Sequence, residues 1–211
     1  MAALTRTPLS GFPAAVRALD WSGHLLPDVL LLGTRAAMVV GVDRDAHARR
    51  ATAGCGPVLD YDTLAIWEWP ESAGRCPPSP VRLAGVLAVA QRSAEPAEPA
   101  WSAEPAGGRA GARAGGRPAG RSVRRAVGVA RRWTGFGPAA VLLPAGVDPP
   151  SCRLECGYAG VGVVALGAGD EPARLLQPGR AGRAERSRRR TLDRWVEEQL
   201  YRRLLDSGTL D

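Results

Sequence analysis

Short apolar runs bounded by glycine or proline recur along the chain and predict a sheet. Two of them lie close together, Ala139–Leu143 and Val161–Leu166, and each is rich in valine or leucine. Runs of this length between chain-breaking residues are typical of buried strands. The earlier segment 28–43 holds two further apolar runs joined by Gly33-Thr34-Arg35, a strand–turn–strand pattern in which glycine supplies the positive φ of a tight turn.

Three more segments have strand-like composition. The run Thr63–Trp69 is β-branched and aromatic, which predicts a strand that ends at Pro70 with Trp67 and Trp69 on one face. Residues 81–91 are apolar enough for a buried strand or a short helix, and periodicity alone does not decide between them. A last short strand is expected at about 173–177.

Helical patterns surround these runs. Short helices are expected at 12–20 and after Asp43 or Asp45, the latter ending before Gly54. Residues 122–133 form an amphipathic pattern with one basic face. In the segment 191–207, Thr191 is the expected N-cap. An apolar stripe is predicted there to pack on the sheet, with a dimer contact as the alternative; it comprises Leu192, Trp195, Val196, Leu200 and Leu204. Glu198 and Arg202 are four residues apart, the spacing of an ion pair within one helix.

A low-complexity segment interrupts the pattern between residues 92 and 121. It repeats Ala-Glu-Pro three times and then turns rich in arginine and glycine, a composition typical of disorder. The sequence therefore predicts one α/β domain, a single mixed sheet flanked by helices. Residues 1–91 form its first half, 92–121 a linker, and 122–211 its second half with the C-terminal helix.

Charge and composition narrow the possible functions. The formal net charge is +7, all 28 basic residues are arginine, and neither lysine nor asparagine occurs. A GC-rich genome is the simplest cause of this arginine bias, because lysine and asparagine have AT-rich codons. Without lysine, a P-loop, a protein-kinase site and a pyridoxal Schiff base are excluded in their usual forms.

The remaining chemistry-bearing residues are few. Among the four cysteines only Cys152 and Cys156 are close in sequence, and they are expected to be reduced structural thiols, with a disulfide or metal site as the alternative. Two histidines cannot form a multi-histidine metal site. No apolar run approaches the ~20 residues of a membrane helix, and we expect a soluble cytoplasmic protein.

The segment Gly160–Ala165 (GVGVVA) formally matches a dinucleotide-binding fingerprint. That motif requires a preceding strand and a helix that opens within it. Here the glycines lead into a strand, so a nucleotide site is not expected.

Residues 122–180 resemble the C-terminal half of the PD-(D/E)XK nuclease superfamily. The resemblance rests on VRRAVGVARRW, PAAVLLP and YAGVGVVAL, a helix followed by strands of the kind that come after the active-site strands in those enzymes. It implies metal-assisted hydrolysis, in which two carboxylates hold Mg²⁺ and a lysine orients or activates water.

The family motif fits this chain in two registers, neither of them complete. In the first, Pro27-Asp28 supplies the first acid and Asp43-Arg44-Asp45 stands at (D/E)-x-K, so Asp45 replaces the lysine. These aspartates could still hold Mg²⁺, although Asp is also favoured in caps and turns. In the second, Asp60 or Asp62 is the first acid and Ala90-Gln91-Arg92 fills the later motif. Arginine is not a base at neutral pH, so this register implies an inactive relative.

Three functions follow as expectations. The first is a degenerate nuclease-like module that binds DNA or RNA through phosphate contacts without cutting it. Its contact residues would be Arg124, Arg125, Arg131, Arg132, Arg186, Arg188, Arg189 and Arg190. The second is a protein-interaction or regulatory module that uses the Trp67/Trp69 face or the last helix, and the third is an Mg²⁺-dependent nuclease that uses Asp28, Asp43 and Asp45.

Overall fold

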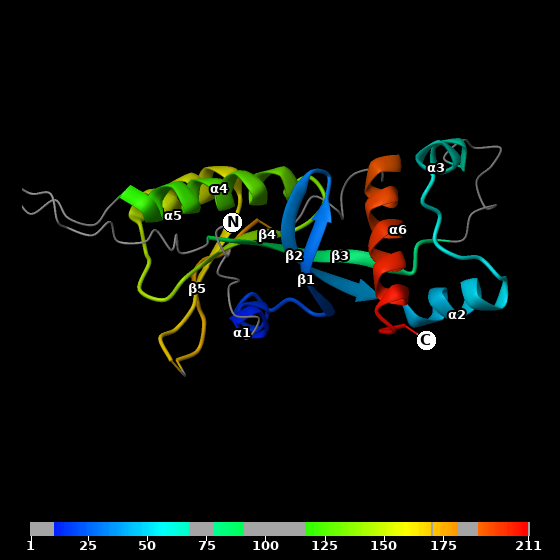
Figure 1. The fold of residues 1–211 in the computed structure, drawn as a ribbon, viewed down its shortest axis with the longest axis horizontal. Helices are drawn as coiled ribbons and strands as arrows, with labels where there is room; N and C mark the ends of the chain where they lie inside the picture. Colours follow the sequence, from blue (N-terminus) through cyan, green and yellow to red (C-terminus); the bar gives the residue numbers. More distant parts are fainter. Residues whose placement is uncertain (1–10, 68–77, 91–116, 170, 181–189, 211) are drawn as a thin grey trace, which may run out of the picture.

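A single six-stranded mixed sheet organises the molecule (Figure 1). The computed structural model describes residues 11–67, 78–90, 117–169, 171–180 and 190–210. The strands lie in sequence order: β1 (His24–Leu31), β2 (Thr34–Val42), β3 (Val81–Val89), β4 (Ala139–Leu143), β5 (Gly162–Ala165) and β6 (Arg174–Gln177). The helices are α1 (Gly11–Ala18), α2 (Arg44–Thr52), α3 (Tyr61–Trp67), α4 (Arg117–Trp133), α5 (Pro150–Ala159) and α6 (Thr191–Asp206). The predicted α/β class is confirmed.

The predicted early hairpin is formed by β1 and β2. Its turn lies at Leu32-Gly33, where both residues have positive φ, 50° and 69°. A two-residue turn of this kind matches the twist of the flanking strands. Thr34, expected in the turn, instead begins β2 and pairs with Leu31. Its hydroxyl donates to the carbonyl of Leu31 at 3.1 Å and accepts from the indole Nε1 of Trp133 at 2.9 Å, which ties the turn to α4.

The strand directions divide the sheet. β1, β2 and β3 form an antiparallel meander, β3, β4 and β5 are parallel, and β6 returns antiparallel to β5. The parallel pairs need crossover connections, which α4 and α5 supply. Every residue of β4 is buried, which explains its unbroken apolar sequence.

Helices cover both faces of the sheet. Along β4, the side chains of Val141 and Leu143 pack with α4, α5 and α6, whereas those of Ala140 and Leu142 pack on the opposite face with Phe12 of α1. Figure 1 shows α1 on the other side of the sheet from α4 and α5. The face under α4, α5 and α6 holds the larger core.

The C-terminal helix packs as predicted. Val196, Leu200 and Leu204 are buried in the larger core, and Leu192 and Trp195 are partly buried. The predicted pair of Glu198 with Arg202 is wrong. Arg202 instead binds Asp206 at 2.8 Å, and Glu198 points inward to a partner on α2.

A further prediction is wrong, and one helix was not predicted. The composition of Thr63–Trp69 predicts a strand, but 61–67 is the helix α3. The carboxylate of Asp60 accepts from the main-chain N–H of Thr63 at 2.8 Å, and this N-terminal capping outweighs the β-propensity of the segment. The sequence pattern assigns no element to residues 150–159, which form the helix α5, with Pro150 at its first turn and Gly160 left-handed at its end.

The interrupting segment also needs a correction. Residues 117–121 of the predicted disordered stretch form the first turn of α4, because the helix begins at Arg117 rather than Ser122. The rest of that stretch, residues 92–116, lies outside the described residues. Residues 81–89 are a strand, which resolves the ambiguity there. No helix within the described ranges has the length and apolar character required to cross a bilayer.

Candidate nucleic-acid interface

The outward face of α4 carries a row of arginines. Apolar positions spaced three or four apart form its buried face: Val123, Ala126, Val127, Ala130 and Trp133. The exposed arginines lie on the opposite side of the helix: Arg121, Arg124, Arg125, Arg131 and Arg132. We call these five the α4 arginine face. At 1.5 Å per residue they span roughly 17 Å along the helix.

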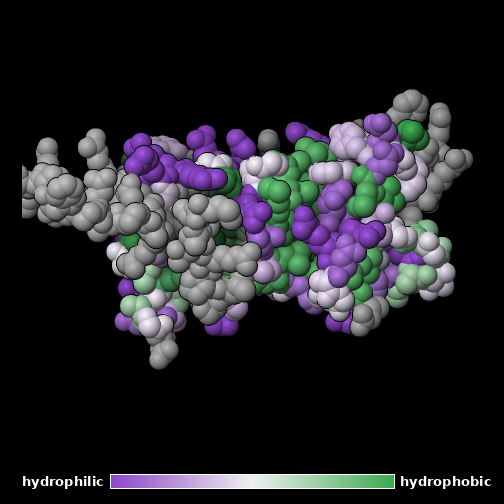
Figure 2. Space-filling model, in the orientation of Figure 1, coloured by the Kyte–Doolittle hydropathy of each residue, from purple (hydrophilic) through white to green (hydrophobic). Residues whose placement is uncertain are grey.

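Helix α4 itself carries no negative charge. The sequence of α4, RPAGRSVRRAVGVARRW, contains neither aspartate nor glutamate. Within the ranges that the structure describes, none of the five guanidinium groups forms an ion pair. Figure 2 shows hydrophilic residues gathered over α4 at the upper left of the molecule. The five cations are therefore available to an anionic partner.

The second predicted arginine cluster is only partly described. Arg186, Arg188 and Arg189 lie outside the described residues. Arg190 is exposed and precedes α6, where its main-chain N–H donates to the carboxylate of Asp193 at 3.0 Å. Of the arginines predicted to bind phosphate, the structure brings together the four on α4.

The structure does not bring the three aspartates of the first set together. Asp28 lies in β1 beside the first half of β2 and binds Arg35 at 2.8 Å. Asp43 follows β2 at its far end, about six residues or roughly 20 Å along the strand from Asp28. Its carboxylate caps α2 by accepting from the main-chain N–H of Ala46 at 2.9 Å, and Asp45 lies in the first turn of the same helix. The three aspartates act as ion-pair, cap and helix-end residues.

The second set is also split. Asp60 caps α3, and the bonds of Val58 and Pro78 to the Arg50–Glu198 pair place it on the side where β3 begins. Ala90 follows the other end of that nine-residue strand, which is roughly 30 Å long. Gln91 and Arg92 lie outside the described residues. Across the described part of the chain, no group of three or more His, Cys, Asp or Glu residues is placed to hold a metal ion.

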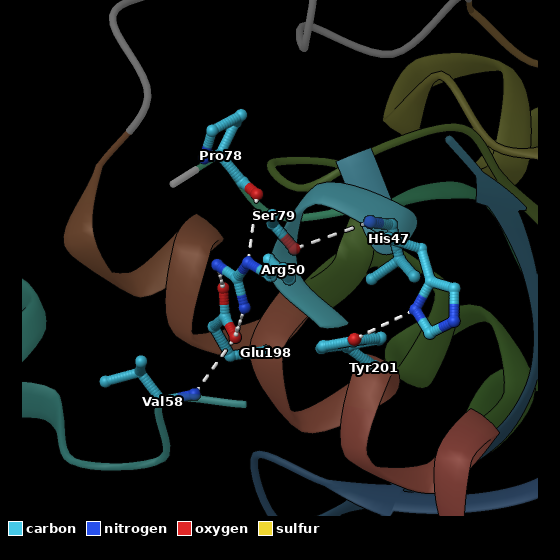
Figure 3. Close-up of polar contacts among 8 residues, drawn as sticks. His47, Arg50, Val58, Pro78, Ser79, Glu198 and Tyr201 are labelled. Carbon is cyan, nitrogen blue, oxygen red and sulfur yellow. Dashed lines mark hydrogen bonds and ion pairs between the residues drawn. The ribbon is translucent and has the colours of Figure 1, made fainter. Parts of the chain in front are cut away.

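A buried ion pair lies between α2 and α6, on the face of the sheet that α4 also covers (Figure 3). The guanidinium of Arg50 on α2 binds the carboxylate of Glu198 on α6 through two bonds, of 2.7 and 2.8 Å, and both side chains are at most 1% exposed. Arg50 Nε also donates to the carbonyl of Pro78 at 3.2 Å, and Glu198 accepts from the main-chain N–H of Val58 at 3.0 Å. The pair therefore ties α2, α6 and two loops together.

Tyr201 and His47 extend this cluster. The Tyr201 hydroxyl lies 3.0 Å from His47 Nδ1, and the Arg50 guanidinium stands 5.5 Å from the centroid of the Tyr201 ring. Burial, and secondarily the Glu198 carboxylate, raise the pKa of the Tyr201 phenol, while Arg50 opposes the shift. Among the described residues, every buried side-chain donor and acceptor has a partner. The arrangement is a structural tie, which sequence spacing did not reveal.

The cysteine pair lies inside α5. Cys152 and Cys156 are free thiols buried against the sheet, with their Sγ atoms 3.9 Å apart. The hydrogen bond with Cys152, together with burial, raises the pKa of the Cys156 thiol well above its ordinary value. Both thiols therefore lie in the core as free cysteines, whereas Cys76 lies outside the described residues, and the reduced state of the cysteines stays a prediction.

Sequence reasoning missed the outward side of α5, where Leu154 and Tyr158 are exposed. The reason is that the sequence pattern assigns no element to 150–159, so neither side of this segment is predicted to be exposed. Pro149, Pro150 and Gly160 were the signal that could have found the helix, since proline favours its first turn and glycine its end.

No family model, no curated protein and no solved structure matches this chain. Its function therefore has to be inferred from the geometry of the described residues.

Proposed function

We propose that this protein binds nucleic acid through the α4 arginine face and does not cut it. The observation that carries the proposal is the exposed, acid-free row of five arginines on one rigid helix. Cations in such a row displace condensed counterions from a phosphate backbone, which gives affinity without sequence readout. An inactive nuclease-like module is the form of the proposal that fits the order of elements best.

The topology is compatible with the nuclease-like comparison. An antiparallel meander, β1 to β3, is followed by the crossover helix α4 and then by parallel β4 and β5. This is the order that the sequence resemblance implies. The separation of Asp28 from Asp43 and Asp45 favours binding over cleavage. Fold-level likeness by itself does not carry function, so the arginine face remains the main support.

The decisive experiment is a salt titration of binding to a labelled 15-base-pair duplex and to a 15-nucleotide single strand. The test variant replaces Arg124, Arg125, Arg131 and Arg132 by Gln, which keeps helix propensity and removes charge. Because four phosphates would then keep their counterions, the slope of log Kobs against log[salt] on the duplex should fall by about 3 to 4.

A matched control changes the net charge equally elsewhere. Arg44, Arg49, Arg82 and Arg174 are exposed and do not belong to α4. Their replacement by Gln should leave most of the slope intact. Equal losses in the two variants would reduce the effect to net charge, and an absence of binding to either probe at about 50 mM salt would refute the proposal.

A further inference from the structure

The outward side of α5 exposes unusually large apolar groups. Tyr158 is 83% exposed and Leu154 is 63% exposed, the two highest values among the large hydrophobic side chains of the described residues. Cys152 and Cys156 turn the opposite side of this helix into the core. Tyr158 therefore presents an aromatic ring to solvent, on a helix whose opposite side packs in the core.

A groove runs beside these two residues. It has a volume of about 630 Å³ between α5 and β6 and is lined by, among others, Pro150, Leu154, Tyr158, Leu176 and Gln177. With its amide oriented to satisfy both atoms, Gln177 donates to the carbonyl of Arg153 at 2.8 Å and accepts from the N–H of Gly157 at 2.9 Å. Gln177 thus links β6 to α5 across the groove. The groove is open to solvent, so a planar group could lie against its apolar border without being enclosed.

Helix α5, which lines the groove, lies next to α4 and its arginine face. α4 leads into β4 and α5 into β5, and these two strands are neighbours. Buried residues of both helices belong to the same core on the same face of the sheet, and the two helices touch each other. Their outward sides therefore form one surface, with arginines on one helix and Tyr158 on the next.

The charges on α5 itself nearly cancel. Arg153 binds Asp148 at 3.1 Å, and Glu155 is exposed on the same helix. Attraction for an anion on this surface therefore comes from α4, while α5 contributes apolar and aromatic area. That division matches a ligand with a charged backbone and flat, uncharged side groups.

We infer that the preferred ligand is single-stranded nucleic acid, with a base stacked on Tyr158 above the α5–β6 groove and its phosphates on the α4 arginine face. The inference rests on the proposed function and narrows its substrate class. Single strands expose base faces, which stack on aromatic side chains with little sequence preference, whereas a duplex keeps its bases paired and stacked. Leu154 and Leu176 provide an apolar border for the stacked base.

The test compares the 15-nucleotide single strand with the 15-base-pair duplex at equal salt. Tyr158→Ala should weaken single-strand binding about tenfold and leave duplex binding unchanged, since one base–aromatic stack is removed. Tyr158→Trp should bind at least as well as the wild type, and the fluorescence of the new indole should be quenched by the single strand. Tyr61→Ala, at a 45% exposed tyrosine on α3, is the matched control and should have no effect.

The two proposals fail differently. Binding that depends on the α4 arginines but is equal for Tyr158→Ala and wild type on the single strand would overturn this inference and leave the proposed function standing. Preference for the duplex in the wild type would also overturn it, and would leave the groove to a protein partner. Failure to bind either probe would overturn both proposals.

Discussion

Arg50 and the α4 arginines lie on the same face of one sheet and use the same side chain in opposite ways. Arg50 is 1% exposed and directs its donors to Glu198 and Pro78. Arg124, Arg125 and their neighbours on α4 are exposed and have no acidic residue on their own helix. One arginine joins helices, and the others are open to a ligand.

The difference shows why net charge is a poor guide to function in this chain. The planar guanidinium suits both a bidentate carboxylate and a phosphate, so composition cannot separate the two uses. Placement separates them. Burying a cation is tolerable only with a well-aligned partner, whereas an exposed row of cations costs little and leaves a field for anions.

The largest expected effect comes from breaking the buried pair. Glu198→Ala removes the carboxylate that binds the buried Arg50 guanidinium through two bonds, and the free energy of unfolding should fall by about 3–5 kcal/mol. Chemical denaturation monitored by tryptophan fluorescence measures it. The double variant Arg50→Met/Glu198→Leu should recover more than half of the loss, because no buried charge remains. A loss below about 1 kcal/mol for Glu198→Ala would mean that the pair is not buried in solution.

Removing a carboxylate that acts only within its own helix should lower the free energy of unfolding by a smaller amount. Asp43→Ala removes the cap of α2 and should cost about 1 kcal/mol in the same assay. Asp45→Ala, in the first turn of that helix, should cost less because Asp45 acts only on the helix dipole. In a cleavage assay with supercoiled DNA and Mg²⁺, we expect no cleavage by the wild type and therefore none by either variant. Mg²⁺-dependent cleavage that Asp43→Ala abolishes would restore the nuclease hypothesis.

The phenol beside the buried pair gives a pH test. Burial raises the pKa of Tyr201 above its unfolded value, so the folded state favours the neutral phenol. The stability that this contributes is complete below the unfolded pKa of 10.0 and is lost as pH rises through the folded pKa. Tyr201→Phe should cost about 1 kcal/mol at pH 7 through its lost hydrogen bond. It should also flatten the decline of stability above about pH 10, and an unchanged alkaline decline would contradict this.

The smallest effect on stability belongs to the exposed arginines. Replacing Arg124, Arg125, Arg131 and Arg132 by Gln should change the free energy of unfolding by no more than about 0.5 kcal/mol, since each lies on the surface away from any buried feature. Chemical denaturation measures this as well. A loss of several kcal/mol would show that these side chains support the fold, and would end the contrast with Arg50.

Much of the fold follows from local sequence. The short apolar runs at 139–143 and 161–166, each delimited by glycine or proline, contain strands. The apolar stripe of the last helix is buried because the spacing of its residues matches the helical repeat. The misses are also local. At 63–67 the aromatic and β-branched residues favour a strand, but capping by Asp60 decides for a helix. At 150–159 the prolines and glycine delimit a helix that its mixed composition conceals.

The site is less predictable, for a physical reason. The basic face of α4 can be anticipated because its arginines are neighbours on one helix. Spacing pairs Glu198 with Arg202, four residues away, whereas its partner Arg50 is separated from it by 148 residues. Spacing within one element carries no information about such a contact. For the same reason, only the pairing of β1 with β2 reveals that the aspartates of the first set lie apart.

The tie between α2 and α6 has a consequence for how the chain is made. At about 5–20 residues per second, a ribosome that has released Arg50 adds 148 further positions over roughly 7–30 seconds before Glu198 emerges. Until then the guanidinium of Arg50 lacks the carboxylate of Glu198, and the apolar surface that α6 covers in the folded protein is exposed to water. The tie can therefore form only after α6 has been synthesised, and a chain that stops before α6 would lack both this ion pair and the apolar cover of the larger core.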